Sequence, residues 1–203
     1  MKHCDVAIIG AGPAGSSGGI QLAAKGYAVA LLDKEKFPRE KLCGDFLNPV
    51  TWPMLRELEV EQAVLARPHK KISTFRLTSF SGEEAEIPLP AGRDETTIGL
   101  GLRRFDLDYV LSERAKGLGV TVLDGWKPKG LERQVDRWIL RGDGSDVFGK
   151  LGARILIGAD GRNSWVAHHL RLADPAVMQG RSVGFQFRLK YANRTTGAVE
   201  IHL

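Results

Sequence analysis

Three closely spaced glycines are the first residues whose types and spacing suggest chemistry. Gly10, Gly12 and Gly15 follow an apolar run at residues 6–9 and open a candidate helix at residues 14–25. In such a turn the first glycine permits the tight bend, the second lets the backbone approach a pyrophosphate, and the third lets the helix pack close to the sheet. Unpaired N–H groups and the positive end of the helix dipole then face the phosphates. The pattern predicts a dinucleotide-binding turn.

An acidic residue follows at the spacing that this turn requires. Asp33 ends a second apolar run at residues 27–32 and stands 18 residues after Gly15. A carboxylate there accepts hydrogen bonds from ribose hydroxyls and repels a 2′-phosphate, so NADP is disfavoured. The alternative is a helix-capping glycine loop beside a surface aspartate. The residues expected to contact the ADP end of the dinucleotide are Gly10, Gly12, Pro13, Ala14, Gly15, Asp33 and Lys34.

The segment after Asp33 separates FAD from NAD through a resemblance. Residues 34–45 contain Phe-Pro-Arg-x-Lys-x-Cys-Gly, which resembles a stretch of the geranylgeranyl reductase-like flavoproteins, relatives of the aromatic-ring hydroxylases and flavin halogenases. The resemblance implies FAD as cofactor, Arg39 near its ribose and phosphates, and Cys43-Gly44 near its isoalloxazine ring. Solvated loop charge is the alternative for Arg39. Cys43 is either a catalytic redox or acid group or a small apolar filler.

Two further segments resemble the same superfamily. Arg104-x-x-Leu107-Asp108-x-x-Leu111 is similar to the opening of its second FAD-domain helix, whose arginine reaches the pyrophosphate. This register favours Arg104 over Arg103, and surface charge or capping is the alternative role. Residues 155–164 resemble the Gly-Ala-Asp-Gly segment, which implies that Asp160 touches FAD; a plain helix N-cap is the alternative.

Composition narrows the remaining classes of protein. The net charge is +5 at pH 7, yet the basic residues are scattered, apart from a loose group at residues 34–41, and do not alternate with aromatic residues as in nucleic-acid platforms. The two cysteines, Cys4 and Cys43, exclude a disulfide framework, and the histidines show no metal-ligand spacing. Neither a signal peptide nor a membrane span is expected, which favours a cytoplasmic protein. The spacing of the histidines and cysteines predicts that the protein has no metal site.

The order of apolar runs and turns predicts the fold class. We expect an α/β protein: a Rossmann-type, three-layer FAD-binding domain with an inserted, incomplete β-rich substrate domain. The FAD-binding domain is expected at residues 1–68 and 101–174, and the substrate domain at residues 69–100 and 175–203. Expected helices cover residues 53–65, 105–117 and 161–170; a buried strand covers 153–157, and two strands follow residue 183. Asp124-Gly125 and Asp143-Gly144 are read as hairpin turns.

The resemblance implies an FAD-dependent oxidoreductase whose reduced flavin saturates a C=C bond of an isoprenoid or similar apolar substrate. NADH or NADPH is the expected external reductant, and a lipid substrate would imply peripheral membrane contact. One alternative is a flavin monooxygenase or halogenase acting on an apolar or aromatic molecule. Lys70 or Lys71 could then match the halogenase lysine, although solvated charge is the commoner role of lysine.

The second alternative is a truncated nucleotide-binding fragment without turnover. Flavoproteins of this resemblance carry a second Gly-Asp segment far downstream, and the Gly-Asp pairs at residues 44–45 and 142–143 precede no expected helix. The last residues also read as a strand with an unpaired edge, which favours association between copies. We therefore expect the 203 residues alone to hold the flavin ring loosely, to turn over little and to form homo-oligomers.

Overall fold

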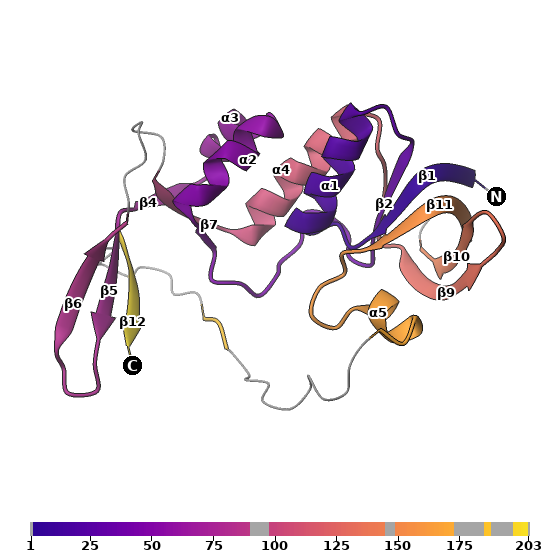
Figure 1. Ribbon diagram of the computed structural model, residues 1–203. Helices are drawn as coiled ribbons and strands as arrows, with labels where there is room; N and C mark the ends of the chain where they lie inside the picture. The colour runs from indigo at the N-terminus through magenta and orange to yellow at the C-terminus, as the bar shows by residue number, and fades with distance from the viewer. Residues whose placement is uncertain (1, 90–97, 145–148, 173–184, 188–196, 203) are drawn as a thin grey trace. The chain divides into compact units, whose positions relative to one another are not determined.

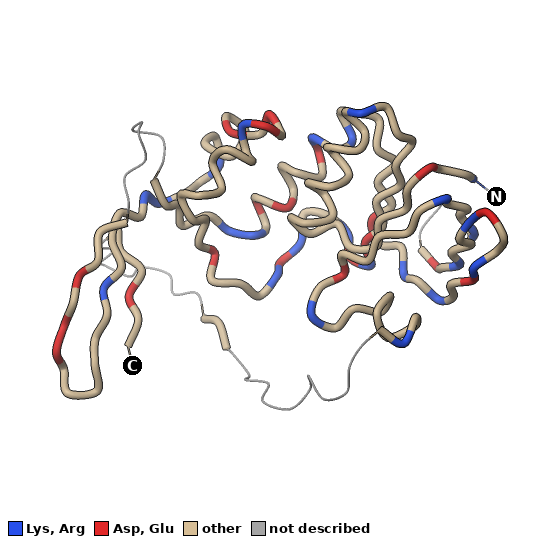
Figure 2. Tube along the Cα trace, viewed as in Figure 1, with Lys and Arg blue, Asp and Glu red and all other residues tan. Residues whose placement is uncertain are grey.

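The computed structural model describes residues 2–89, 98–144, 149–172, 185–187 and 197–202 (Figure 1). By their internal contacts these residues group into two compact units. The first unit comprises Met1–Glu40 and Leu107–Val183, and the second comprises Lys41–Asp106 and Gly184–Leu203. Lys and Arg residues, blue in Figure 2, are spread along the traces of both units rather than concentrated on one element.

A six-stranded sheet organises the first unit, in the order β8-β2-β1-β11-β10-β9. The four strands β8, β2, β1 and β11 are parallel, and β10 and β9 continue the sheet in antiparallel fashion. The strand β1 thus lies between β2, the next strand along the chain, and β11, the last strand of this sheet along the chain. The strands are β1 (Lys2–Ile9), β2 (Val29–Asp33), β8 (Thr121–Asp124), β9 (Lys127–Arg133), β10 (Trp138–Asp143) and β11 (Lys150–Gly158).

Burial on both faces explains why the second half of β1 and most of β2 are apolar without alternation. All of β2 is buried, as is the second half of β1, which is typical of parallel strands covered on both sides. The helix α1 (Pro13–Ala24) packs on β1 and β2 and buries Ile20, with Gly19 facing Ile8. A core cluster joins residues of the strands to the residue Val166 of the helix that follows β11: Ala7, Ile9, Ala30, Leu32, Leu123, Trp126, Leu140, Leu151, Ala153 and Val166.

Two more helices belong wholly or partly to the first unit. The helix α4 (Arg104–Gly117) buries Leu107, Val110, Leu111 and Ala115, and its residues from Leu107 onward lie in this unit. The short helix α5 (Trp165–His169) follows β11 and contributes Val166 to the core. The mixed α/β architecture with a parallel-strand sheet confirms the predicted Rossmann-type fold class.

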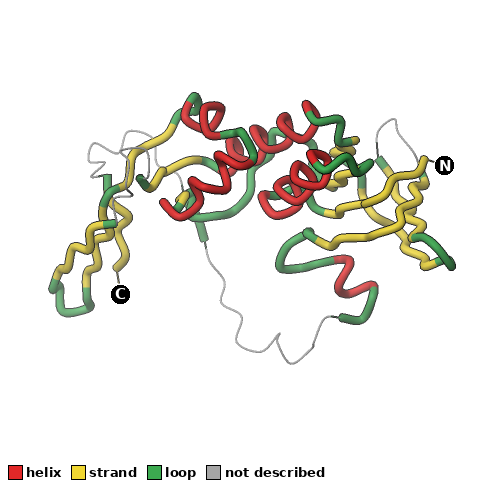
Figure 3. The backbone as a smooth tube through the Cα atoms, turned by 45° about the horizontal axis from the view of Figure 1, so that its top comes forward, coloured by secondary structure: helices red, strands yellow, loops and turns green. Residues whose placement is uncertain are grey.

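The second unit contains two three-stranded sheets, β3-β7-β4 and β12-β5-β6 (strands are yellow in Figure 3). Trp52 is fully buried beside them, and its indole N–H donates to the Ile98 carbonyl over 2.8 Å. The elements are β3 (Phe46–Leu47), η1 (Pro49–Thr51), α2 (Trp52–Glu57), α3 (Glu61–Leu65), β4 (His69–Ile72), β5 (Thr74–Thr78), β6 (Glu84–Pro88), β7 (Gly99–Leu102) and β12 (Ala198–His202).

Several expected elements need correction. The single helix expected at residues 53–65 is two helices, α2 and α3, because Glu59 adopts a left-handed φ of 55° between them. Asp124-Gly125 is a turn but not a hairpin, since β8 and β9 lie at opposite edges of the sheet. The helix expected at 161–170 begins only at Trp165.

The carboxyl-terminal strands are confirmed in part. Of the two strands expected after residue 183, β12 forms, while the first falls mostly outside the described residues, and residues 185–187 are not in a strand. The strand β4 had no prediction of its own. Among the described residues, no helix is long and apolar enough to cross a membrane.

Candidate functional site

The glycine turn lies at the carboxyl end of β1, where two neighbouring strands also end. The Gly10 N–H donates to the Leu32 carbonyl over 2.7 Å, and the Ala159 N–H donates to the Ile9 carbonyl over 2.7 Å. These bonds join the ends of β1, β2 and β11. In open α/β sheets, ligands bind beyond the carboxyl ends of the strands, where the strand order reverses. Here that point lies between β1 and β11.

Close backbone approaches explain two of the three glycines. Gly10 has a φ of +101°, and a Cβ there would lie 2.4 Å from the Ala159 carbonyl oxygen. A Cβ on Gly15 would lie 1.8 Å from the carbonyl oxygen of Gly10 itself. Any side chain at either position would displace backbone atoms. The turn therefore depends on both glycines for its shape, before any ligand is considered.

Gly12 differs, because the chain conformation does not require glycine there. It is the N-cap of α1 with φ −74° and ψ −176°, which any residue adopts, and no side chain caps the helix at this position. Pro13 and Ala14 begin the first turn; proline has no N–H, and the other N–H groups of this turn have no partner inside the helix. A bare backbone at Gly12 and uncapped N–H groups suit an anionic group placed against the helix start.

Asp33 stabilises the turn from the end of β2. Its side chain is 9% exposed. One carboxylate oxygen accepts the Ala11 N–H at 2.9 Å, and the other accepts the Glu35 N–H at 3.0 Å. A carboxylate offers about four acceptor positions, so these bonds leave capacity for a ligand hydroxyl. Lys34, the next residue, is exposed.

Arg39 bridges two carboxylates that are far apart in the sequence. One guanidinium nitrogen donates to Asp33 Oδ2 at 3.3 Å, and another makes an ion contact of 3.1 Å with Asp108 Oδ2. The Arg39 side chain is 10% exposed and Asp108 is fully buried. The Arg39 Nε is buried and has no hydrogen-bond partner among the described residues. Arg39 is thus not a solvated loop charge.

Asp108 is a buried carboxylate whose contact with Arg39 the sequence did not predict. It belongs to the Arg-x-x-Leu-Asp segment, but attention fell on the arginine of that segment. Its charge on a mostly apolar helix face was the available signal, because a buried carboxylate requires a partner. The structure supplies Arg39 as that partner.

Asp160 follows β11 and faces the start of α5. Its Oδ2 accepts the N–H groups of Trp165 at 2.6 Å and Val166 at 3.2 Å, whereas Ser164 is the N-cap and accepts the Ala167 N–H. The other carboxylate oxygen, Oδ1, is buried and has no hydrogen-bond partner in the described part of the chain. Asp160 therefore stabilises α5 and still presents one unpaired acceptor.

These residues fit the ADP portion of FAD. The turn at Gly10–Gly15 has no room for side chains at its ends, and a ligand would meet the start of α1. Arg39 Nε supplies an unpaired donor and Asp160 Oδ1 an unpaired acceptor, the polar atoms that a buried site leaves for a bound group. All of them lie in the first unit.

Three other candidate residues lie in the second unit. Cys43 is half-buried, and its N–H donates to the side-chain oxygen of Gln186 at 3.3 Å. Gly44 has open space where a Cβ would stand. Arg104 is the first residue of α4, and its N–H donates to Asp45 Oδ1 at 3.0 Å. Arg103 instead places its guanidinium 4.9 Å from the centre of the Phe105 ring.

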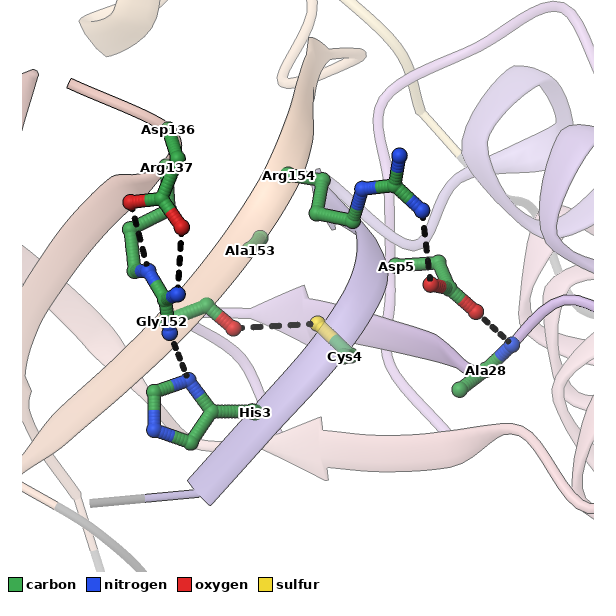
Figure 4. A pocket seen from close by; sticks show the side chains of 9 residues that line it. All are labelled: His3, Cys4, Asp5, Ala28, Asp136, Arg137, Gly152, Ala153 and Arg154. Carbon is green, nitrogen blue, oxygen red and sulfur yellow. Dashed lines mark hydrogen bonds and ion pairs between the residues drawn. The ribbon is translucent and has the colours of Figure 1, made fainter. Parts of the chain in front are cut away.

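A separate cavity of about 540 Å³ lies in the first unit, at the amino ends of the strands (Figure 4). Its charged residues pair with one another: Arg137 with Asp136 and with His3 Nδ1, and Asp5 with Arg154. The Cys4 thiol donates to the Gly152 carbonyl, and burial, with a smaller effect of the Asp5 charge, raises its pKa to about 11. Such a thiol stays protonated near neutral pH and is a poor nucleophile.

The remaining candidates are a metal site and the two lysines considered for a halogenase. The described residues contain no group of three or more His, Cys, Asp or Glu side chains that could hold a metal ion. Lys70 and Lys71 both lie on β4 with exposed side chains.

Comparison with known proteins shows the family to which the chain belongs. Residues 3–197 match the model of a family described as FAD binding domain. The chain is 32% identical over 163 residues to a menaquinone reductase of Mycobacterium tuberculosis, covering 79% of this chain and 38% of that protein. It is 32% identical over 174 residues to a geranylgeranyl diphosphate reductase of Rhodobacter capsulatus, covering 84% and 40%.

A solved structure shows the same fold. The flavin-dependent brominase Bmp2 superposes with a TM-score of 0.70 at 25% identity, covering 83% of this chain and 40% of that one. The chain thus spans about two fifths of the length of each of these proteins.

Proposed function

Because this chain belongs to the FAD binding domain family, FAD is its cofactor, and we propose that the chain is the nucleotide-binding part of an FAD-dependent oxidoreductase. One observation carries the proposal. The glycine turn, Asp33 and Asp160 come together at the joined carboxyl ends of β1, β2 and β11, with unpaired polar atoms left on Asp160 and Arg39.

Each residue has a distinct role in this proposal. Gly10 and Gly15 shape the turn, and Gly12, with Pro13 and Ala14, brings bare backbone to the pyrophosphate. The Asp33 carboxylate would accept hydrogen bonds from the ribose hydroxyls. Arg39 is held between Asp33 and Asp108, which fixes the direction of its guanidinium. Its Nε–H, which has no partner in the described part of the chain, would donate to the ribose and phosphates.

Further candidate residues are proposed to lie near the flavin ring and the substrate. Cys43 and Gly44 lie on the loop proposed to approach the isoalloxazine, and Arg104 is the residue of α4 proposed to approach the pyrophosphate. We propose that residues 69–100 and 175–203 belong to a substrate domain, and residues 1–68 and 101–174 to the FAD domain. The exposed aromatic side chains of Phe185 and Phe187 support an apolar substrate.

The proposed reaction is reduction of a C=C bond in an isoprenoid or similar apolar molecule. When bound and reduced by NADH or NADPH, FAD would supply the hydride chemistry at one carbon of the substrate, and the protein would have to supply the proton that the other carbon takes up. Cys43 is the proposed proton donor, because the resemblance of residues 34–45 assigns Cys43 and Gly44 to the flavin ring. The names of two relatives support this choice, since menaquinone and geranylgeranyl diphosphate both carry prenyl chains.

A monooxygenase or halogenase is the second candidate. The brominase Bmp2 shares the fold at 25% identity, and Lys70 and Lys71 present ammonium groups on β4. In this case oxygen rather than an alkene would react with the reduced cofactor.

Two measurements test the proposal. The purified protein should bind FAD with a flavin absorbance spectrum, and anaerobic addition of NADH or NADPH should bleach that spectrum. Products are then compared between geranylgeranyl diphosphate without oxygen and an aromatic substrate with oxygen and bromide. A saturated prenyl product supports the reductase, and an oxygenated or brominated product replaces it with the second candidate. Absence of FAD binding contradicts both.

A further inference from the structure

Asp45 links three segments of the second unit through one side chain and its backbone. Its Oδ1 accepts the Arg104 N–H at 3.0 Å, and its backbone carbonyl accepts the Leu102 N–H at 2.8 Å. Its Oδ2 accepts the side-chain N–H of Gln186 at 3.1 Å. Gln186 in turn accepts the Cys43 N–H through its side-chain oxygen at 3.3 Å. The loop with Cys43, the start of α4 and residues 185–187 are thus joined.

The backbone conformation of Asp45 indicates that this arrangement is specified. Its φ is +52°, in the left-handed region where a side chain is uncommon and where Asp and Asn are among the tolerated residues. Glycine fits that region without strain, and Gly44 stands immediately before it. An aspartate at this position therefore has a use beyond the turn itself. Its negative charge at the first N–H of α4 also complements the helix dipole.

We propose that Asp45 is a positioning residue, which fixes the Cys43 loop to the first residue of α4 with Gln186 as the connecting side chain. The inference rests on the proposed function, in which Cys43 and Gly44 approach the flavin ring and Arg104 approaches the pyrophosphate. No contact with the flavin ring or with the pyrophosphate is assigned to Asp45 itself. It holds both contact segments at a fixed separation, so that one bound FAD meets both.

The test uses variants that break single links. Asp45→Gly keeps the left-handed backbone and removes both side-chain acceptors. Asp45→Asn keeps an acceptor for the Arg104 N–H but replaces the one that faces Gln186. Gln186→Ala breaks that same link from the other side. Asp106→Asn is the matched control, because it removes an acidic charge from the first turn of α4 without touching these bonds.

Two readouts separate positioning from a merely structural role. All variants are made in a Cys4→Ser background, which leaves Cys43 as the sole thiol. The first readout is the rate of Cys43 alkylation by iodoacetamide in the absence of FAD. The second is the Kd for FAD, and melting temperature verifies that each variant is folded.

We expect Asp45→Gly to raise both the alkylation rate and the Kd for FAD about tenfold, since a hydrogen bond to a charged group contributes this much. Asp45→Asn and Gln186→Ala should each give about a threefold change, and the double variant should be no worse than either, because they break one shared link. Asp106→Asn should stay within about twofold of the parent.

Other outcomes overturn the inference in distinguishable ways. Faster alkylation with an unchanged Kd for FAD would make Asp45 a structural link only. Unchanged alkylation would mean that the loop is not held by Asp45. If the parent itself binds no FAD, the proposed function fails first, and the positioning role fails with it. If Asp45→Gly does not fold, Asp45→Asn and Gln186→Ala give the answer.

Discussion

The two ends of the same sheet in the first unit differ in how their polar groups are used. At the carboxyl ends, backbone crowding excludes side chains at Gly10 and Gly15, and unpaired polar atoms remain on Arg39 and Asp160. At the amino ends lies a cavity of about 540 Å³. There Arg137 is paired with both Asp136 and His3, at exposed or partly exposed positions.

The difference teaches that an open volume is not by itself a binding site. A ligand gains most where the protein has already removed polar groups from water and left them without partners. At the amino ends the charges satisfy one another in contact with solvent, and the Cys4 thiol stays protonated because burial raises its pKa to about 11. The carboxyl ends hold the polar atoms of Arg39 and Asp160 that have no partner in the described part of the chain.

The largest expected difference between the two ends concerns arginine. Arg39→Ala should lower the free energy of unfolding by about 3–5 kcal/mol, because it leaves the buried Asp108 carboxylate without this partner. Arg137→Ala, at the amino ends, should leave the free energy of unfolding nearly unchanged, since exposed pairs contribute little. Urea unfolding followed by circular dichroism measures the free energy of unfolding of both variants. Equal losses would contradict the difference between the buried and the exposed arginine.

Glycines give the next contrast. Gly15→Ala should destabilise the protein by about 1–3 kcal/mol and weaken FAD binding, because the new Cβ meets a backbone carbonyl. Gly152→Ala, at the amino ends, places its Cβ 2.7 Å from His3 Nδ1, an atom of a side chain that can move. Its cost should stay below about 1 kcal/mol. Gly18→Ala in α1, with open space around it, serves as the control. A larger loss for Gly152→Ala would contradict the account.

Aspartates at the two ends should separate by affinity. Asp33→Ala should weaken FAD binding by about 1–3 kcal/mol, the usual contribution of hydrogen bonds to a charged group. Asp136→Ala should leave the affinity unchanged. Calorimetric titration of each variant with FAD distinguishes them. A comparable loss of affinity in Asp136→Ala would contradict the placement of FAD at the carboxyl ends of the strands.

The smallest effect is the alkaline titration of Cys4. Its pKa rises from 9.0 to about 11 on folding. The folded state therefore favours the protonated thiol, and this contribution to stability is complete below pH 9 and is lost as the pH rises towards 11. Because the thiol is only half-buried, solvent screening reduces the size of the loss. Chemical unfolding at pH 8 and at pH 10.5 should show a smaller decline for Cys4→Ala than for wild type, with FAD affinity at pH 8 equal in both. An equal decline in both proteins would assign the alkaline loss to other groups.

The sequence predicted the parts of the site that depend on local chemistry. The glycine spacing and the apolar runs at β1 and β2 indicate the turn, because each rests on neighbouring residues along the chain. The pairing of Arg39 with Asp108 was not predictable in this way, since the two residues meet only after folding. The same holds for Asp45 and Gln186, which are 141 positions apart.

Local patterns also failed where tertiary structure decided the outcome. Asp124-Gly125 has the composition of a hairpin turn, but the chain crosses there to the opposite edge of the sheet. The helix expected at 53–65 is interrupted at Glu59, whose left-handed conformation has no sequence signal as strong as glycine.

The most direct test of the central claim is a calorimetric titration of FAD and of ADP into wild type, Gly12→Val and Arg137→Ala. The account predicts that both ligands bind wild type in equimolar amount and compete with each other. Gly12→Val should abolish both interactions without unfolding the protein, because φ −74° suits any residue and the new side chain fills the pyrophosphate position. Arg137→Ala should bind as wild type does. Absence of binding to wild type, or loss in Arg137→Ala with retention in Gly12→Val, would contradict the account.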